Sequence, residues 1–257
     1  MDILSVSAET EFAEIWYEVA LDDHFWVKHR FEILMREIAA LGLDTQAPFS
    51  GLDVGCGHGA VLRQLGRRTA WTIDGCDLNR EALRRASEHN DGKVLYYNIH
   101  DRRPDMRERY DFVLMLDVIE HIGDTKRFIA SAAHHLRPGG YAFVNVPALQ
   151  TLYSKYDVVT GHLRRYDKSL LREHLNEGGL EVRRLRYWGL TLIPLALIRK
   201  LIVQRMTVAE GIVRKGMQPP SPLVSSLLSG ILSFEAFVMP KLPIGASLLA
   251  IAQKPEN

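Results

Sequence analysis

A glycine-rich loop is the first stretch of this 257-residue chain whose residue types and spacing suggest chemistry. Gly55, Gly57 and Gly59 alternate with other residues, directly after a short apolar run that contains Asp53. Glycine lets the backbone approach a ligand closely, because no Cβ is in the way. A helix that begins after such a loop points its N–H groups and the positive end of its dipole at the ligand. The loop therefore predicts a binding site for a nucleotide-type ligand.

The spacing within this loop distinguishes two kinds of nucleotide ligand. A dinucleotide site has the glycine pattern G-x-G-x-x-G, whereas here Asp53 precedes glycines that alternate. A carboxylate at that point would suit the ammonium group of a methionine moiety and would lie badly beside a pyrophosphate. Asp77, which ends the next predicted strand, is placed to bind both ribose hydroxyls, a role common to both ligands. The spacing argues against a nicotinamide-dependent oxidoreductase, which stays as the less favoured alternative.

A second group of reactive side chains follows the fourth predicted strand. Asp117, Glu120 and His121 come there, at the end of the sheet where ligands gather in open α/β folds. His162 follows the fifth predicted strand and is expected to converge on the same place. His121 and His162 are the candidate catalytic residues, because a histidine can take a proton from a reacting group as a general base. A structural role is the alternative for either histidine.

Two arginines stand beside His162 in the sequence. Arg164 and Arg165 could bind a carboxylate or a phosphate on the substrate, because a guanidinium can pair with such groups through two parallel hydrogen bonds. The alternative is that both arginines lie on a solvated loop.

Alternating β and α patterns predict the elements that must position these residues. Predicted strands cover residues 51–55, 71–77, 93–99, 110–116, 141–146, 180–188 and 247–253. Predicted helices cover residues 9–41, 60–67, 80–89, 125–136 and 169–176, and residues 137–140 are predicted to form a turn. Strands that alternate with helices imply an α/β fold, with a Rossmann-like, seven-stranded, mostly parallel sheet and helices on both faces.

On this pattern the chain divides into four segments. They are an N-terminal helical cap (1–45), a cofactor-binding core (46–188), an apolar helical insertion (189–243) and the last strand of the core (244–257). We interpret the insertion as a substrate lid or an oligomer interface, with a surface that docks on a membrane as the third reading. Its apolar character suggests a hydrophobic or lipid-linked substrate.

Five motifs in register resemble class I S-adenosylmethionine-dependent methyltransferases, in particular a bacterial subset near the ubiquinone-biosynthesis O-methyltransferases. The motifs are residues 52–59, 77–78, 110–113, 116–121 and 136–140, within a resemblance that runs from about Phe25 to Val146. The resemblance implies an enzyme that moves a methyl group from S-adenosylmethionine to an oxygen, rather than a nitrogen, of a small or lipid-like acceptor. A non-catalytic cofactor-binding module that acts through a protein partner is the alternative.

The resemblance also implies which residues bind the cofactor. They are Trp26, Arg30, Asp53, Gly55, Cys56, Gly57, Asp77, Leu78, Asn98, Ile99, Asp117 and Val118. Trp26 and Arg30 belong to an aromatic segment similar to the tryptophan-rich helix that lies over the cofactor in this bacterial subset. The alternative is that Phe25 and Trp26 only anchor this helix on the sheet. Asn98 stands where such families often carry an aspartate near the adenine, and an amide can still hydrogen-bond the adenine edge. The alternative is a loop asparagine whose polar groups are satisfied within the protein.

A metal site is a further implication of the resemblance. The ubiquinone-biosynthesis O-methyltransferases and the small-RNA 2′-O-methyltransferases use an acid-x-x-Glu-His group to bind a divalent metal, and Asp117, Glu120, His121 and His162 are the matching candidates in this chain. Oxygen and nitrogen ligands would suit Mg²⁺, Mn²⁺ or a related ion. Many methyltransferases with this pattern bind no metal, so we expect none.

Composition and charge exclude some classes of function. The net charge is +1, with 32 basic and 31 acidic residues, so we expect no general nucleic-acid binding. Cys56 and Cys76 are the two cysteines, which suggests reduced thiols in a cytoplasmic protein. The first fourteen residues carry acidic and no basic side chains, so we expect no signal peptide. A cytoplasmic protein with peripheral membrane contact, and an oligomer, are both compatible with the sequence.

Overall fold

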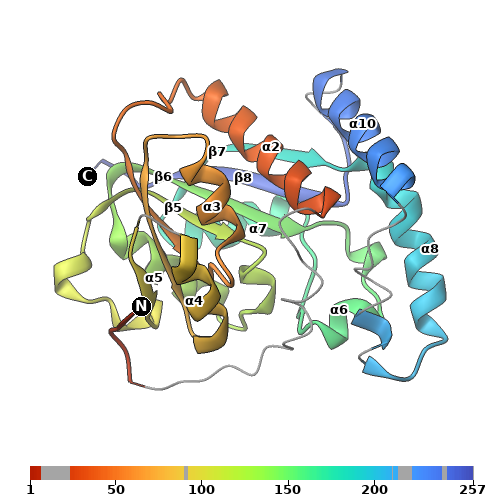
Figure 1. Cartoon of the computed structure of the whole chain (residues 1–257), viewed down its shortest axis with the longest axis horizontal. Helices are drawn as coiled ribbons and strands as arrows, with labels where there is room; N and C mark the ends of the chain where they lie inside the picture. The colour runs from red at the N-terminus through yellow and green to blue at the C-terminus, as the bar shows by residue number, and fades with distance from the viewer. Residues whose placement is uncertain (7–23, 90–91, 210, 214–221, 239–241, 257) are drawn as a thin grey trace.

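The computed structural model describes residues 1–6, 24–89, 92–209, 211–213, 222–238 and 242–256, arranged around one central sheet (Figure 1). The eight strands lie in the order β1-β4-β3-β2-β5-β6-β8-β7. Strand β8 runs antiparallel to β6 and β7, and the other neighbours pair in parallel. The strands are β1 (Asp2–Ile3), β2 (Ser50–Val54), β3 (Thr72–Asp77), β4 (Val94–Tyr96), β5 (Tyr110–Leu116), β6 (Leu136–Pro147), β7 (Glu181–Trp188) and β8 (Ser247–Gln253).

The predicted Rossmann-like α/β fold is confirmed, with three differences in the strands. The strand predicted over 93–99 is shorter, because β4 covers only Val94–Tyr96. The sheet has eight strands, where seven were predicted. The additional strand, β1, has only two residues, which are too few to show the alternating hydrophobic pattern that predicts a strand. Residues 137–140, predicted as a turn, lie inside β6. The pairing jumps there from Tyr110–Leu136 to Phe112–Tyr141, so β6 bulges, and Gly139 adopts a φ of +73° within the bulge. A bulge and a turn use the same glycine-rich sequence, so the pattern could not separate them.

The helices that pack on or beside the sheet mostly follow the predicted ranges. They are α2 (Phe25–Ala40), α3 (Ala60–Gly66), α4 (Arg80–Ala86), α5 (Thr125–His135), α6 (Lys155–Val159), α7 (Lys168–Glu177), α8 (Ile193–Gln204) and α10 (Pro222–Val238). Short 3₁₀ turns cover Ser87–His89, Ile99–Asp101, Pro104–Met106, Ile119–His121, Gln150–Leu152 and Leu190–Leu192. The predicted helix over 9–41 begins at Phe25 among the described residues, since residues 7–23 lie outside them.

Alternating residues of β5 pack on opposite faces of the sheet. Phe112 and Leu114 belong to the core that α2, α3 and α4 cover. Val113 and Met115 belong to the core that α5 and α7 cover. Side chains alternate along a strand, so a nearly continuous apolar run such as this one supplies both cores at once. The sheet is therefore covered on both faces.

The described part of the predicted insertion is helical and is anchored by one buried acid. The carboxylate of Glu235 on α10 accepts hydrogen bonds from the backbone N–H groups of Gly189 (2.7 Å), Leu190 (3.0 Å) and Thr191 (2.9 Å), and from the Thr191 hydroxyl (2.7 Å). The side chain of Ile33 on α2 packs with Leu232 in a small core beside this contact. Helix α10 is therefore attached both to the end of β7 and to α2.

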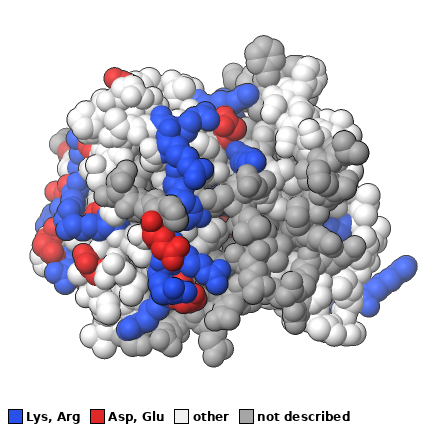
Figure 2. All heavy atoms as spheres, in the orientation of Figure 1, with Lys and Arg blue, Asp and Glu red and all other residues white. Residues whose placement is uncertain are grey.

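Helices α8 and α10 carry many exposed apolar side chains. The exposed large side chains there are Leu195, Leu197, Ile198, Leu201, Ile202, Val224, Leu227, Ile231 and Phe234. On the face shown in Figure 2 most charged side chains lie on the side away from these two helices, and a few basic side chains lie at the right, where Figure 1 shows α8. Within the described ranges, no helix is long and apolar enough to cross a membrane. The membrane-docking and oligomer-interface readings of this surface stay predictions.

Candidate active site

One cavity of about 890 Å³ opens at the carboxyl ends of β2 to β5, with α2 and α8 at its sides. Its lining includes every residue expected to bind a cofactor and both candidate catalytic histidines. They come from segments far apart in the sequence, and the parallel strands bring their ends to one edge of the sheet. The volume lies in the range of small-molecule sites. The structure thus brings the expected residues together, and their individual roles stay predictions.

The glycine loop has the backbone conformation that its sequence predicts. Gly55, Gly57 and Gly59 have φ values of +74°, +53° and +80°, in the region that side chains other than glycine rarely adopt. A Cβ added to Gly55 would lie 2.7 Å from Cγ2 of Val118. The Gly57 N–H donates to the carboxylate of Asp77 at 2.9 Å. The loop is therefore closed against both β3 and the residues that follow β5.

Two acids lie at the ends of neighbouring strands beside this loop. Asp53 has an exposed fraction of 3%. Burial raises the pKa of Asp53 to about 7, while Arg30 opposes this shift and Asp77 adds to it. Burial also raises the pKa of Asp77, against hydrogen bonds from the backbone of Asn79 and Gly57 that favour its ionised form. A cationic ligand beside these acids would be stabilised by their ionisation, so the pair suits a positively charged group.

A chain of polar contacts joins the cap helix α2 to the end of β5. Arg30 forms an ion pair with Asp117, and its guanidinium lies 5.1 Å from the ring centroid of Trp26. The second carboxylate oxygen of Asp117 accepts from Nδ2 of Asn145 at 2.8 Å. Nε1 of Trp188 donates to the amide oxygen of Asn145 at 2.9 Å. Sequence reasoning missed Asn145 and Trp188, because neither stands in a motif.

Asn98 caps a short turn at the adenine end of the expected site. Its side-chain oxygen accepts from the N–H of His100 at 3.0 Å, and its own N–H donates to the Ser5 hydroxyl at 2.8 Å. The side-chain oxygen and the backbone N–H of Asn98 are therefore both engaged within the protein. Asn98 nevertheless lines the cavity. A hydrogen bond with the adenine edge would have to come from the side-chain amide nitrogen of Asn98.

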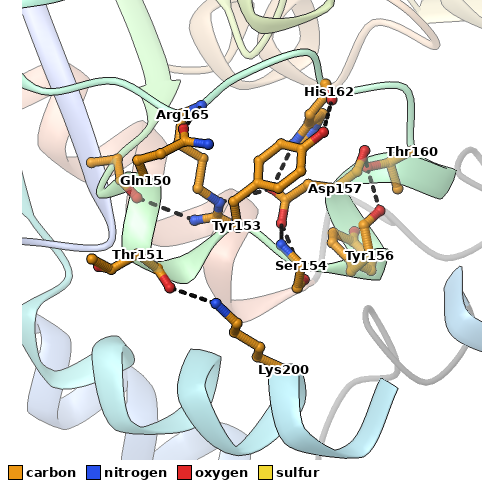
Figure 3. A network of polar contacts seen from close by, with 11 residues as sticks. Gln150, Thr151, Tyr153, Ser154, Tyr156, Asp157, Thr160, His162, Arg165 and Lys200 are labelled. Atoms are coloured by element: carbon orange, nitrogen blue, oxygen red, sulfur yellow. Dashed lines mark hydrogen bonds and ion pairs between the residues drawn. The ribbon is translucent and has the colours of Figure 1, made fainter. Parts of the chain in front are cut away.

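His162 is held by a buried acid that the sequence analysis did not single out (Figure 3). Nδ1 of His162 lies 3.0 Å from Oδ1 of Asp157, which also accepts from Nε of Arg165 at 2.8 Å. The N–H and hydroxyl of Ser154 donate to Oδ2 of Asp157 at 2.8 and 3.1 Å. A carboxylate at Nδ1 keeps the proton on that nitrogen, so Nε2 is the nitrogen that can accept a proton.

The electrostatics of Asp157 favour its ionised form. Burial alone would raise its pKa, but hydrogen bonds from His162 and Arg165 and the charge of Arg165 outweigh burial and hold the pKa of this carboxyl below its usual range. His121 lies beside the pair, with its ring centroid 4.8 Å from that of His162. Burial, with a smaller effect of His162, lowers the pKa of His121 to about 4. His121 is therefore neutral at pH 7.

The two arginines of the predicted anion site point elsewhere. Arg165 lines the cavity, but its guanidinium is bound to Asp157 and to the backbone oxygen of Ala148. Arg164 does not line the cavity, and it donates to the Thr125 hydroxyl at 2.9 Å. The two guanidinium groups are bound to different partners in different places, so they do not form one anion site.

Three of the four candidate metal ligands come together. Glu120, His121 and His162 each offer a ligand atom, and these atoms lie within 4.8 Å of one another. Both carboxylate oxygens of Glu120 are buried and have no hydrogen-bond partner among the described residues. Burial, with the nearby charge of Asp117, raises the pKa of Glu120 well above its usual range. Asp117 is engaged by Arg30 and Asn145 instead.

Comparisons with known proteins agree with this geometry. A family model described as a methyltransferase domain matches residues 26–185. A ubiquinone biosynthesis O-methyltransferase of Thiobacillus denitrificans is 28% identical over 151 residues, which cover 56% of this chain and 62% of the relative, less than two thirds of its length.

Solved structures show the same fold at low sequence identity. A Galdieria sulphuraria protein provisionally named a sarcosine dimethylglycine methyltransferase superposes with a TM-score of 0.60 at 21% identity, covering 90% of this chain and 87% of its own. The [4+2]-cyclase SpnF superposes with a TM-score of 0.56 at 16% identity, covering 88% of this chain and 82% of its own. The fold alone therefore does not specify the reaction.

Proposed function

Since the chain belongs to the family of methyltransferase domains, we propose that it transfers a methyl group from S-adenosylmethionine to a hydroxyl oxygen of an apolar acceptor. One observation carries this proposal. A single cavity contains the glycine loop with its two acids and, beyond them, a histidine oriented by a buried carboxylate. The first group suits a cationic nucleoside, and the second suits the removal of a proton from an acceptor.

The cofactor half of the cavity would hold S-adenosylmethionine through the loop and the acids. Asp53 would meet the ammonium group, and Asp77 would meet the ribose hydroxyls. Arg30 and Trp26 lie on the α2 side of the cavity and would cover the cofactor from there. When bound, the cofactor supplies a methyl group on a sulfonium, and the electrons of the broken sulfur–methyl bond stay on the sulfur.

The acceptor half would take the proton that the transfer releases. As the new oxygen–methyl bond forms, the acceptor O–H bond breaks and Nε2 of His162 receives the proton. Asp157 stabilises the imidazolium that results, because its carboxylate is bound at Nδ1. General bases of this kind contribute a factor of about 10² to 10⁴. Alignment of acceptor and methyl group in the closed cavity would supply most of the rest.

A divalent metal is the alternative means of activating the acceptor. The buried oxygens of Glu120 have no hydrogen-bond partner among the described residues and lie beside two imidazoles, so they fit a metal ion. Without an ion, burial favours the protonated form of Glu120, because it raises the pKa of this carboxyl. Without Asp117 the ligand set is richer in nitrogen than expected, which suits Mn²⁺, Zn²⁺ or Fe²⁺ better than Mg²⁺. Such an ion would lower the pKa of an acceptor hydroxyl. Metal analysis of the purified protein, with Glu120→Gln as the comparison, distinguishes the two routes.

The proposal is tested by ligand titration followed by turnover. In isothermal titration, S-adenosylhomocysteine is expected to bind and NAD is not. Asp77→Ala should abolish the binding, whereas Asp105→Ala, an exposed acid outside the cavity, should not. Binding of NAD instead would favour the oxidoreductase alternative. Binding of S-adenosylhomocysteine without turnover on any of a broad panel of hydroxylated acceptors would favour the non-catalytic module.

A further inference from the structure

Asn145 is a fully buried amide in the apolar second half of β6, between Val144 and Val146. A buried amide is unfavourable unless both its donor and its acceptor have partners. Nδ2 of Asn145 donates to Oδ1 of Asp117 at 2.8 Å, and Oδ1 of Asn145 accepts from Nε1 of Trp188 at 2.9 Å. An indole N–H only donates and an ionised carboxylate only accepts, so these partners fix which end of the amide faces which residue. Asparagine supplies a donor and an acceptor at once here, which an apolar residue cannot do.

Asp117, the first partner of this amide, stands at a backbone turn. Its φ of +61° lies in the region that residues other than glycine rarely adopt. The backbone N–H of Asp117 donates to the backbone oxygen of Asn145 at 2.8 Å, so Asn145 binds both the backbone and the side chain of this residue. Directly after the turn, Val118 lies against the glycine loop, where a Cβ on Gly55 would meet it. The conformation of Asp117 therefore determines where the residues after β5 enter the cavity.

Trp188, the second partner, packs against helix α2. Its side chain is buried. The ring centroid of Trp188 lies 6.0 Å from that of Trp26 and 5.5 Å from that of His29, and both of these residues belong to α2. Ile33, one turn further along α2, is part of the same small core as Trp188. The hydrogen bond to Asn145 fixes the orientation of the indole that Trp26 and His29 contact.

Helix α2 also meets the other partner of Asn145. Arg30 forms the ion pair with Asp117, and its guanidinium lies 5.1 Å from the ring centroid of Trp26. Trp26 and Arg30 are four residues apart, so they lie on the same side of the helix. One polar contact and one aromatic contact of α2 therefore both lead to the amide of Asn145. Trp26, Arg30 and Asp117 line the cavity, whereas Asn145 does not.

We infer that Asn145 is a positioning residue for the cofactor site. Its amide holds Asp117 and Trp188 so that α2, with Trp26 and Arg30, lies in one place against the cavity. Asn145 acts only through these partners, because it does not line the cavity. That the ligand beside α2 is S-adenosylmethionine rests on the proposed function. The placement of α2 does not, so the two can be tested apart.

Amide hydrogen exchange of the full-length, ligand-free protein tests the placement of α2. Asn145→Leu has a similar size and neither donor nor acceptor, so it leaves Asp117 and Trp188 without this partner. We expect exchange in α2 to become at least about tenfold faster, with a smaller change or none in β2 and β3. An equal change throughout the sheet would overturn the inference, because Asn145 would then stabilise the fold in general.

The matched control is Val144→Ala, one residue earlier in the same strand. Val144 is buried as completely, but its side chain packs on the other face of the sheet, in the core that α5 and α7 cover. Its truncation should change exchange in α2 no more than in β2 and β3. If Asn145→Leu does not fold, Asn145→Ser is measured instead, since the serine hydroxyl is too short to bind both partners. Unchanged exchange of α2 in the variant that folds would overturn the inference.

A double-mutant cycle with Arg30 tests how Asn145 acts on cofactor binding. In isothermal titration, Asn145→Leu should weaken the binding of S-adenosylhomocysteine by about tenfold, which is within the range of coupling between residues of one hydrogen-bond network. In an Arg30→Met background the same substitution should weaken binding by a smaller factor, because the ion pair through which Asn145 acts is already lost. Equal factors in the two backgrounds would show independent effects and would overturn the inference.

The two measurements separate this inference from the proposed function. If Asn145→Leu speeds exchange in α2 but the wild type does not bind S-adenosylhomocysteine, the positioning of α2 stands and the proposed cofactor fails. If the wild type binds it and Asn145→Leu changes neither this binding nor the exchange in α2, the proposed function stands and the inference fails.

Discussion

Asp157, one fully buried carboxylate, organises the part of the cavity that we propose for proton transfer. It binds Nδ1 of His162, the guanidinium of Arg165 and the cap of α6 at Ser154. The arginine offsets the charge, and the histidine keeps a free Nε2. An acid in this position controls both the tautomer and the orientation of the histidine.

His162→Ala tests the assignment of this histidine to the chemistry. We expect the rate of methyl transfer to fall by a factor of about 10² to 10⁴, because the proton acceptor is lost. The affinity for S-adenosylhomocysteine should stay within about twofold, because Asp53 and Asp77 remain in place. Single-turnover rates and isothermal titration measure the two quantities. His134→Ala, a histidine of α5 outside the cavity, is the control. Equal losses of rate and affinity would remove His162 from the chemistry.

Asp53 predicts a pH dependence of cofactor binding. Burial raises its pKa to about 7 in the folded protein, whereas in the unfolded chain it is about 3.9. A raised carboxyl pKa stabilises the fold at low pH, and this contribution is lost as the pH rises from about 4 to 7. An ammonium ligand favours the ionised carboxylate. The affinity for S-adenosylhomocysteine should therefore increase by up to about tenfold per pH unit between pH 5.5 and 7, and then level off.

Asp53→Asn should weaken this binding and remove most of its pH dependence, because an amide does not titrate. The exposed Asp105→Asn should keep the wild-type profile. Titrations at several pH values check both. A wild-type affinity that is flat from pH 5.5 to 7.5 would show that Asp53 is already ionised without the ligand.

At the scale of elements, the position of the insertion depends on the contacts that attach α10 to the rest of the protein. Glu235 accepts four hydrogen bonds from residues 189–191 at the end of β7. The same helix packs on α2 through Leu232 and Ile33. Helix α2 carries Trp26 and Arg30, which lie on the cofactor side of the cavity. The contacts of α10 therefore connect the insertion with the helix beside the proposed cofactor site.

Glu235→Ala should loosen the insertion without unfolding the core. A hydrogen bond to a charged group contributes about 1.5–3 kcal/mol to the free energy of unfolding. The contributions of neighbouring bonds are not additive, so the four bonds together contribute less than their sum. We expect faster amide hydrogen exchange in α10 and at residues 189–191, with unchanged protection in β5 and β6. Glu235→Gln, which keeps one good acceptor, should have a smaller effect. Faster exchange throughout the sheet would show that the hydrogen bonds of Glu235 stabilise the whole fold.

At the scale of the whole molecule, the cofactor site exists only in the folded chain. Its walls come from four strand ends, α2 and α8. A ligand that binds only the folded state stabilises it by about 2.7 kcal/mol at one hundred times its dissociation constant. S-adenosylhomocysteine at that concentration should raise the free energy of unfolding by this amount, and NAD should not. Denaturant unfolding measures it, and Asp77→Ala, which loses the ligand, should show no increase.

Local patterns were enough to predict much of the fold. The apolar runs and helical periods predicted the order of strands and helices, and the glycine spacing predicted the loop at Gly55 to Gly59. Hydrophobic periodicity and glycine spacing involve residues close together in the sequence, so they can be recognised without knowledge of the tertiary contacts. Strand β1 and the bulge at Gly139 were missed or misassigned, because two residues show no period and a glycine pair is compatible with both a bulge and a turn.

The sequence by itself determined which residues stand at the strand ends, and hence the glycine loop, Asp53 and Asp77 at one edge of a parallel sheet. Only the tertiary structure decided the partners of the side chains. Asp157 beneath His162, Asn145 beside Asp117, and Arg199 over Tyr156 join residues from different elements. The succession of strands and helices along the chain follows from local hydrophobic patterns, whereas these contacts depend on how the elements pack in space. For that reason the sequence predicted the cofactor half of the cavity more fully than the acceptor half.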